Sequence, residues 1–150
     1  MTATVQHLRE ELTYLKSVSA DQARTMPPSY YTSADFLALE EDIIFRREWV
    51  CIGHTGEIPN PGDYFATELV GEQLIVLRDE AGEVRTLSNV CRHRGNMLVE
   101  GKGNRKRFIC GYHAWVYDSA GHLKNAPLMD QIEGFDKSAC TLPSFATEIW

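Results

Sequence analysis

The sequence predicts a mainly β protein in which small antiparallel sheets follow two N-terminal helices. In the first 47 residues, apolar side chains recur at the three- and four-residue spacing of helices. After residue 48, short apolar runs alternate with turn sequences such as Asn60-Pro61-Gly62-Asp63. Many short strands at close spacing favour an antiparallel sandwich or barrel over a parallel sheet. We therefore expect a helical lead-in over residues 1–47 and a β domain over residues 48–150.

The first predicted helix covers residues 3–17 and ends before Met26-Pro27-Pro28, a sequence that breaks helices. Its apolar face carries Val5, Leu8, Leu12 and Leu15. The second predicted helix covers residues 32–47, where Thr32 and Asp35 resemble a capping box. Its buried stripe is expected to comprise Phe36, Leu39, Ile43 and Ile44.

Six short apolar runs are the predicted strands. They cover residues 49–53, 64–70, 73–78, 84–89, 107–109 and 115–118. The first run contains Trp49, which we expect to pack in the core. Residues 141–150 have the pattern of an approach to one further strand.

Composition excludes several classes of protein. A chain of 150 residues is long enough for one domain with a sizeable core. The net charge of −6 argues against a nucleic-acid binder, which usually has a basic balance. No apolar run approaches the 18 or so residues of a membrane span, and the N-terminus lacks the apolar core of a signal peptide. We therefore expect no membrane association and a cytoplasmic location.

Two short motifs, Cys91-Arg92-His93 and Cys110-Gly111-Tyr112-His113, carry the candidate metal ligands. Each motif offers one thiolate and one imidazole, and the 16 residues between them leave room for strands that bring the motifs together. Two thiolates on one iron and two neutral imidazoles on the other are the ligands of a Rieske 2Fe–2S cluster. The sequence therefore predicts one-electron transfer through a cluster on Cys91, His93, Cys110 and His113.

A structural zinc site is the alternative for the same four residues, since two Cys and two His also suit tetrahedral zinc. Zinc modules usually place two Cys in one motif and two His in another, whereas both motifs here are mixed. Tyr112, Trp115 and Tyr117 follow the second motif and are expected to form an aromatic wall that limits the access of water. The other cysteines, Cys51 and Cys140, are expected to be free thiols.

The two motifs resemble those of Rieske non-haem iron oxygenases, in the α subunits of ring-hydroxylating and related enzymes. The resemblance rests on the segment from Cys91 to Gly95 and the segment from Cys110 to Asp118, and it extends upstream to Tyr31-Thr32-Ser33 and downstream past Gly121-His122-Leu123. It implies small antiparallel sheets, with a cluster held at the tips of two hairpin-like loops. Extra loop cysteines of the respiratory-chain type are missing, which indicates the low-potential branch.

The resemblance also implies roles for the ligands and partners for the chain. It implies Cys91 and Cys110 on an inner iron and His93 and His113 on an outer, exposed iron, with His113 as the electron exit. Electrons would arrive from a reductase or ferredoxin and leave for a mononuclear non-haem iron in a neighbouring subunit of a homotrimer.

The catalytic domain of that family, with an iron on two His and a carboxylate, has no expected counterpart in these 150 residues. Outside the two motifs the chain has only His7, His54 and His122, which we expect to be surface or loop residues. A stand-alone Rieske ferredoxin is therefore the alternative to an oxygenase domain, and a zinc module is a more remote one.

Overall fold

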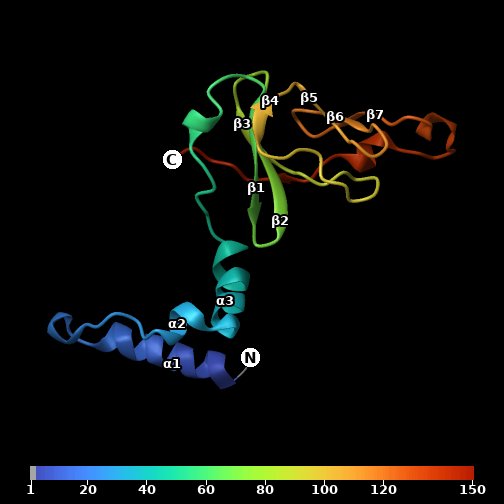
Figure 1. Cartoon of the computed structure of the whole chain (residues 1–150). Helices are drawn as coiled ribbons and strands as arrows, with labels where there is room; N and C mark the ends of the chain where they lie inside the picture. Colours follow the sequence, from blue (N-terminus) through green and yellow to red (C-terminus); the bar gives the residue numbers. More distant parts are fainter. Residues whose placement is uncertain (1–2) are drawn as a thin grey trace. The chain divides into compact units, whose positions relative to one another are not determined.

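The computed structural model describes residues 3–150 and separates them into two compact units, with the boundary after Val50. The first unit is helical and the second is built from two antiparallel sheets (Figure 1). Within the described residues, none of the helices combines the length and the apolar character needed to cross a membrane. The mainly β, antiparallel class predicted from the sequence is confirmed.

The helical unit begins with α1 (Ala3–Ser17), which has the bounds predicted from the sequence. A short helical turn, η1 (Ala20–Gln22), and the helix α2 (Ser29–Thr32) follow it (Figure 1). The small core contains Leu8, Tyr30 and Phe36, with the two rings edge to face at 4.9 Å. The hydroxyl of Tyr30 donates a hydrogen bond of 2.6 Å to the carbonyl of Leu8, which ties α2 to α1.

The second predicted helix is shorter than expected and starts at a different cap. Helix α3 (Ala34–Glu40) is capped by Ser33, whose hydroxyl accepts a hydrogen bond from the Phe36 N–H at 3.2 Å, so the capping box at Thr32 was wrong. The chain then continues as a wider π-helical turn, η2 (Glu41–Phe45). The wider turn shifts the register of the apolar stripe, which leaves Ile43 and Ile44 about two-fifths exposed.

The β unit contains a five-stranded sheet and a three-stranded sheet, and every neighbouring pair of strands is antiparallel. The larger sheet has the order β4-β1-β2-β3-β8, with β1 (Asp63–Leu69), β2 (Glu72–Arg78), β3 (Val84–Ser88), β4 (Lys102–Asn104) and β8 (Ser144–Phe145). The smaller sheet has the order β5-β6-β7, with β5 (Arg107–Ile109), β6 (Val116–Asp118) and β7 (Leu123–Asn125). Three helical turns, η3 (Thr55–Glu57), η4 (Met129–Gln131) and η5 (Lys137–Cys140), complete the unit.

The predicted strand over residues 49–53 is wrong, and Trp49 is 70% exposed instead of buried. Within the β unit, Ile52 and Gly53 contact side chains of the larger sheet but form no strand. Ile52 packs against a cluster formed by Ile58, Phe65 and Val76. A Cβ atom on Gly53 would lie 2.4 Å from the Phe65 ring, so only glycine allows this close passage.

The main core lies where the two sheets pack together, and it holds the residues of both metal-ligand motifs. Tyr64 of β1 meets Phe108 of β5 edge to face, with the ring centroids 5.6 Å apart. Ile75, Leu87, Tyr117 and other buried side chains belong to the same cluster, as do Cys91 and Cys110. The packing of the two sheets therefore fixes the positions of both cysteines.

Candidate metal centre

The two metal-ligand motifs lie in two loops that have the same backbone hydrogen bonds. In the first loop, the Cys91 N–H donates to the Asn96 carbonyl and the Gly95 N–H donates to the Cys91 carbonyl. In the second, the Cys110 N–H donates to the Trp115 carbonyl and the Ala114 N–H to the Cys110 carbonyl. All four distances are between 2.8 and 3.0 Å. Each loop thus encloses six residues and starts at its cysteine.

The fifth residue of each loop has a left-handed backbone. Gly95 has a φ of 69°, and its equivalent Ala114 has a φ of 56°. This turn brings the chain back on itself so that the sixth residue can pair with the cysteine. Glycine adopts such angles without strain, whereas alanine adopts them at a cost of about 1 kcal/mol.

Paired strands hold both loops in place. The first loop lies between Val90 and Met97, which form an isolated antiparallel bridge. The second connects β5 to β6, whose last paired residues are Ile109 and Val116. The resemblance noted in the sequence implied two hairpin-like tips, and the loops have this arrangement.

The four candidate ligands lie together at the tips of these loops. Cys91 and Cys110 are each 2% exposed, whereas His93 is half-buried and His113 is exposed. The centroids of the two imidazole rings are 4.6 Å apart, at an interplanar angle of 67°. The site therefore has a buried pair of thiols and a pair of imidazoles nearer the surface.

His93 is prepared to bind a metal in its neutral form. Its Nδ1 atom is, within the described part of the chain, the single buried side-chain nitrogen or oxygen that has no hydrogen-bond partner. Burial lowers the pKa of His93, and the nearby charges of His113 and Arg94 lower it further. A neutral imidazole with a buried, unpaired nitrogen is a ready ligand for iron or zinc.

The thiol of Cys91 contacts the hydroxyl of Tyr117, with a distance of 3.4 Å between sulfur and oxygen. The same oxygen accepts a hydrogen bond of 3.1 Å from the Arg92 N–H, so its own hydrogen is free for the sulfur. Burial raises the pKa of Cys91, and the adjacent Cys110 thiol adds to the increase, while the Tyr117 hydroxyl opposes it. A metal has to displace this retained proton when it binds.

Aromatic rings contact both imidazoles. Trp115 is buried and stacks on His93, with centroids 4.7 Å apart and the planes 8° from parallel. Tyr112 lies against His113 at 3.9 Å but is 58% exposed, so it is not part of a buried wall. Phe135 supports Trp115 edge to face at 5.7 Å, a contact for which the sequence had no local signal.

The remaining Cys and His residues lie elsewhere. His54 caps η3 by accepting a hydrogen bond from the Gly56 N–H, and His122 pairs with Asp118 at 3.3 Å. Both are exposed, as is His7. All four cysteines are free thiols in the structure.

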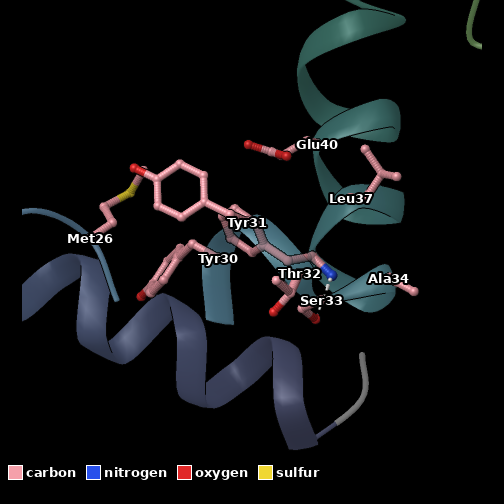
Figure 2. Close-up of a pocket in the computed structure, with 9 residues that line it drawn as sticks. Met26, Tyr30, Tyr31, Thr32, Ser33, Ala34, Leu37 and Glu40 are labelled. Atoms are coloured by element: carbon pink, nitrogen blue, oxygen red, sulfur yellow. Dashed lines mark hydrogen bonds between the residues drawn. The ribbon is translucent and has the colours of Figure 1, made fainter. Parts of the chain in front are cut away.

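A separate hollow of about 470 Å³ lies in the helical unit (Figure 2). Tyr31 and Met26 lie on one side of it and Glu40 on another. No Cys or His lines it, so it has no part in the ligand set. Its lining residues are Met26, Tyr30, Tyr31, Thr32, Ser33, Ala34, Phe36, Leu37 and Glu40.

The geometry of the four residues suits a two-iron cluster. In the described residues, no three or more Cys, His, Asp or Glu side chains surround a single point suited to one ion. A 2Fe–2S cluster does not require this, because each iron takes only two protein ligands and the inorganic sulfides complete its coordination. A thiol pair beside an imidazole pair, with one imidazole nitrogen buried and unpaired, fits this demand.

Comparison with known proteins agrees with the geometry. Residues 48–145 match the family described as the Rieske [2Fe-2S] domain. The chain is 36% identical over 129 residues to the oxygenase subunit of carnitine monooxygenase from Acinetobacter baumannii, covering 85% of this chain and 35% of that protein. It is 38% identical over 114 residues to the α subunit of benzene 1,2-dioxygenase from Pseudomonas putida, covering 75% of this chain and 25% of that protein.

The solved structures show the same likeness. Naphthalene 1,2-dioxygenase from Rhodococcus sp. bound to indole has a TM-score of 0.80 and 34% identity, covering 93% of this chain and 31% of that one. The chain thus spans between a quarter and about a third of the length of these relatives. The fold is of the Rieske type, and the cofactor that it serves is a 2Fe–2S cluster. The match over residues 48–145 and the two paired loops within it establish that this chain belongs to the Rieske [2Fe-2S] domain family.

Proposed function

We propose that this chain is the electron-transfer domain of a Rieske non-haem iron oxygenase. Cys91 and Cys110 hold one iron of the cluster, and His93 and His113 hold the other through their ring nitrogens. The bound cluster supplies reversible one-electron chemistry. The observation that carries the proposal is the apposition of the two loops, with a buried thiol pair beside imidazoles 4.6 Å apart.

The relatives support an electron-transfer role instead of a substrate site. Their names specify carnitine, benzene and naphthalene as the molecules oxidised, yet all share this part of the chain. Molecules so different in shape and charge need different pockets, whereas the supply of electrons is common to them. We therefore assign the two loops to electron delivery and the substrate chemistry to the rest of an oxygenase.

The full reaction would proceed in three parts. A reductase or ferredoxin gives single electrons to the domain, and His113, the exposed imidazole, passes them on. The acceptor is a mononuclear non-haem Fe(II) centre that activates dioxygen in a catalytic domain, across a subunit boundary of a homotrimer. Within this scheme residues 48–150 are the redox domain, residues 1–47 are its lead-in, and the cytoplasm is the compartment that keeps Cys51 and Cys140 reduced.

The direct test is the metal content and visible spectrum of the protein purified in air. Two irons and two acid-labile sulfides per chain are expected, with absorption that bleaches on addition of dithionite. A colourless protein with one zinc per chain would overturn the proposal in favour of the zinc module. A second test is the coding DNA after codon 150, where an in-frame segment with two His and a carboxylate is expected for an oxygenase. A stop codon there would favour a free electron carrier.

The ligand assignment is tested by substituting His113→Cys. A thiolate in place of a neutral imidazole adds negative charge, which disfavours the reduced state, so a lower reduction potential is expected. His122→Cys is the matched control, because His122 is an exposed histidine outside the site. Equal potentials in the two variants would show that His113 is not a ligand.

A further inference from the structure

Charge is strongly segregated along this chain. The whole protein carries a net charge of −6, but residues 91–113 contain six Lys or Arg and a single acidic residue, Glu100. This segment therefore carries +5, while the other 127 residues carry −11. The same segment contains all four candidate cluster ligands.

Four of the six cations form no ion pair that is found in the described residues, and two of these four lie beside a ligand; of the other two, Arg105 lies over the Tyr64 ring and Arg107 is in β5. Lys102 forms an ion pair with Glu57, and Lys106 pairs with Glu80 at 3.2 Å. Arg92 and Arg94 are exposed, and no ion pair to either is found in the described part of the chain. Both flank His93 directly in sequence.

The first loop is also held rigidly. The Arg92 N–H donates a hydrogen bond to the Tyr117 hydroxyl, and the Cys91 N–H and carbonyl both form hydrogen bonds within the loop. A fixed backbone presents the two guanidinium groups with less loss of freedom when a partner binds.

The two loops share a backbone but differ in side-chain chemistry. The first loop has an arginine on each side of its histidine, whereas the second, from Cys110 to Trp115, contains no acidic side chain, Lys or Arg. Transient redox complexes are small and use charge to reach fast association, while permanent interfaces are more apolar. The chemistry of the first loop suits a partner that binds and leaves at each turnover.

We infer that the first loop, through Arg92 and Arg94, is the docking site for an acidic one-electron donor protein. The inference rests on the proposed electron-transfer function and adds the surface and the charge of the partner. One electron leaves the reduced donor, which is oxidised, and one ferric ion held by the loops becomes ferrous; no bond forms or breaks and no proton is needed. The docking charges thus belong to the first loop, whereas the exit residue His113 belongs to the uncharged second loop, with its ring 4.6 Å from that of His93.

The test uses a plant-type [2Fe–2S] ferredoxin, an acidic protein whose reduction potential is lower than that of a Rieske cluster, so that electron transfer to the cluster is favourable. Binding of its oxidised form to the oxidised protein is measured by fluorescence anisotropy across a series of salt concentrations. Reduction by its reduced form is followed by stopped-flow absorbance. The double variant R92E/R94E is expected to weaken binding and slow reduction by about tenfold or more at low salt, and to flatten the salt dependence.

The matched control is K16E/R24E, which changes the net charge by the same amount at two exposed residues of the helical unit. It is expected to change binding and rate less than threefold. Equal effects of the two double variants would overturn the inference, because the net charge of the protein would then govern docking. The absence of an effect in both would overturn it as well, because charge would then have no part in docking. If R92E/R94E loses its cluster, the variant R92Q/R94Q replaces it in the test, because it removes the two positive charges without adding negative ones. Its effect on binding and on the reduction rate is expected to lie between those of the unsubstituted protein and R92E/R94E.

Dithionite separates this inference from the proposed function. If dithionite reduces the protein but substitution of Arg92 and Arg94 does not change its reaction with ferredoxin, the proposed electron-transfer function stands and the docking site is wrong. A protein with no cluster for dithionite to reduce contradicts the proposed function itself.

Discussion

The hydroxyl of Tyr117 lies 3.4 Å from the sulfur of Cys91, and the backbone of Arg92 fixes its orientation by donating to the same oxygen. When Cys91 binds iron as a thiolate it carries no hydrogen, so in the cluster-bound protein only the Tyr117 hydroxyl can donate in this contact. A hydrogen bond to a thiolate ligand stabilises the cluster more after reduction, when the sulfur carries more negative charge. Tyr117 therefore raises the reduction potential.

We expect Tyr117→Phe to retain the cluster and lower its potential by about 30–60 mV. A hydrogen bond to a charged group contributes roughly 1.5–3 kcal/mol. If about half of that differs between the two redox states, the reduction equilibrium constant changes by up to about tenfold, and a tenfold change corresponds to about 59 mV for one electron. Redox titration of the visible spectrum measures it. Tyr112→Phe removes an exposed hydroxyl beside His113 and should leave the potential unchanged. Equal potentials for Tyr117→Phe and the unsubstituted protein would show that the hydroxyl does not bind the sulfur.

Asn89 fixes the segment that returns from the first loop. It is fully buried, and its side chain accepts from the N–H groups of Leu98 and Val99 and donates to the carbonyl of Val99. Asn89→Ala would leave the N–H and the carbonyl of Val99 unpaired, whereas the Leu98 N–H would keep its hydrogen bond to the backbone carbonyl of residue 89. We expect it to lower the free energy of unfolding by about 2–5 kcal/mol and to release iron at lower denaturant concentration.

Urea titration with detection at the cluster absorbance measures this effect. The control is Asn104→Ala, because Asn104 makes two side-chain hydrogen bonds, to Pro61 and Asp63, on an exposed surface. That variant should lose about 1 kcal/mol or less. Similar losses in both variants would mean that the buried network has no special role.

Local patterns in the sequence predicted the features that depend on neighbours along the chain. The helix over residues 3–17 follows from apolar periodicity, and the ligand motifs follow from the chemistry of Cys and His at short spacing. Five of the six predicted strands were found where apolar runs are bounded by turns, and the one over residues 49–53 was not. These features need no knowledge of distant partners.

The features that the sequence could not predict depend on contacts between distant segments. Trp49 lies in an apolar run, but no strand pairs with it, so its burial was wrongly expected. Strands β4 and β7 were not predicted, because each has only three residues and is defined by its pairing with β1 or β6. The contact between Tyr117 and Cys91 joins residues 26 positions apart, and no local pattern marks it.

The turn between β1 and β2 contains a strained residue. Val70 has a φ of 50° and Gly71 a φ of 79°, and positive angles at both positions are typical of a type I′ turn. A β-branched side chain is unfavourable in this conformation, at about 1–2 kcal/mol. We expect Val70→Asn to raise the free energy of unfolding by about 1 kcal/mol, or the melting temperature by about 4–8 °C.

Thermal unfolding followed by circular dichroism measures the change. Val84→Asn is the control, since Val84 lies in β3 without a positive φ and packs against the cluster that contains Ile58. It should destabilise the protein. A loss of stability in Val70→Asn would contradict the assignment of strain to Val70.

Asp79 makes the stability of the β unit depend on pH. Its buried carboxylate accepts from Arg85 Nε at 2.7 Å and from the N–H groups of Ala81 and Glu83 at 2.9 Å. Burial by itself raises the pKa of Asp79, but the hydrogen bonds from Arg85 and the backbone outweigh it, so the pKa is lowered overall. Because the folded pKa lies below the unfolded one, near 3.9, the carboxylate stabilises the fold above about pH 4. This contribution is lost as the pH falls through the folded pKa.

We therefore expect Asp79→Asn to lower the free energy of unfolding at pH 7 by about 1–3 kcal/mol, because the amide cannot accept all three hydrogen bonds. The difference from the unsubstituted protein should shrink as the pH falls below about 4, where Asp79 becomes protonated in the unfolded chain and then in the folded one. Urea titrations between pH 3 and pH 7 measure both effects. Glu80→Gln is the control, since Glu80 forms an exposed ion pair with Lys106 and should contribute less than about 1 kcal/mol at any pH. A difference for Asp79→Asn that stays constant down to pH 3 would show that the charge of Asp79 does not stabilise the turn, and that its loss acts through packing alone.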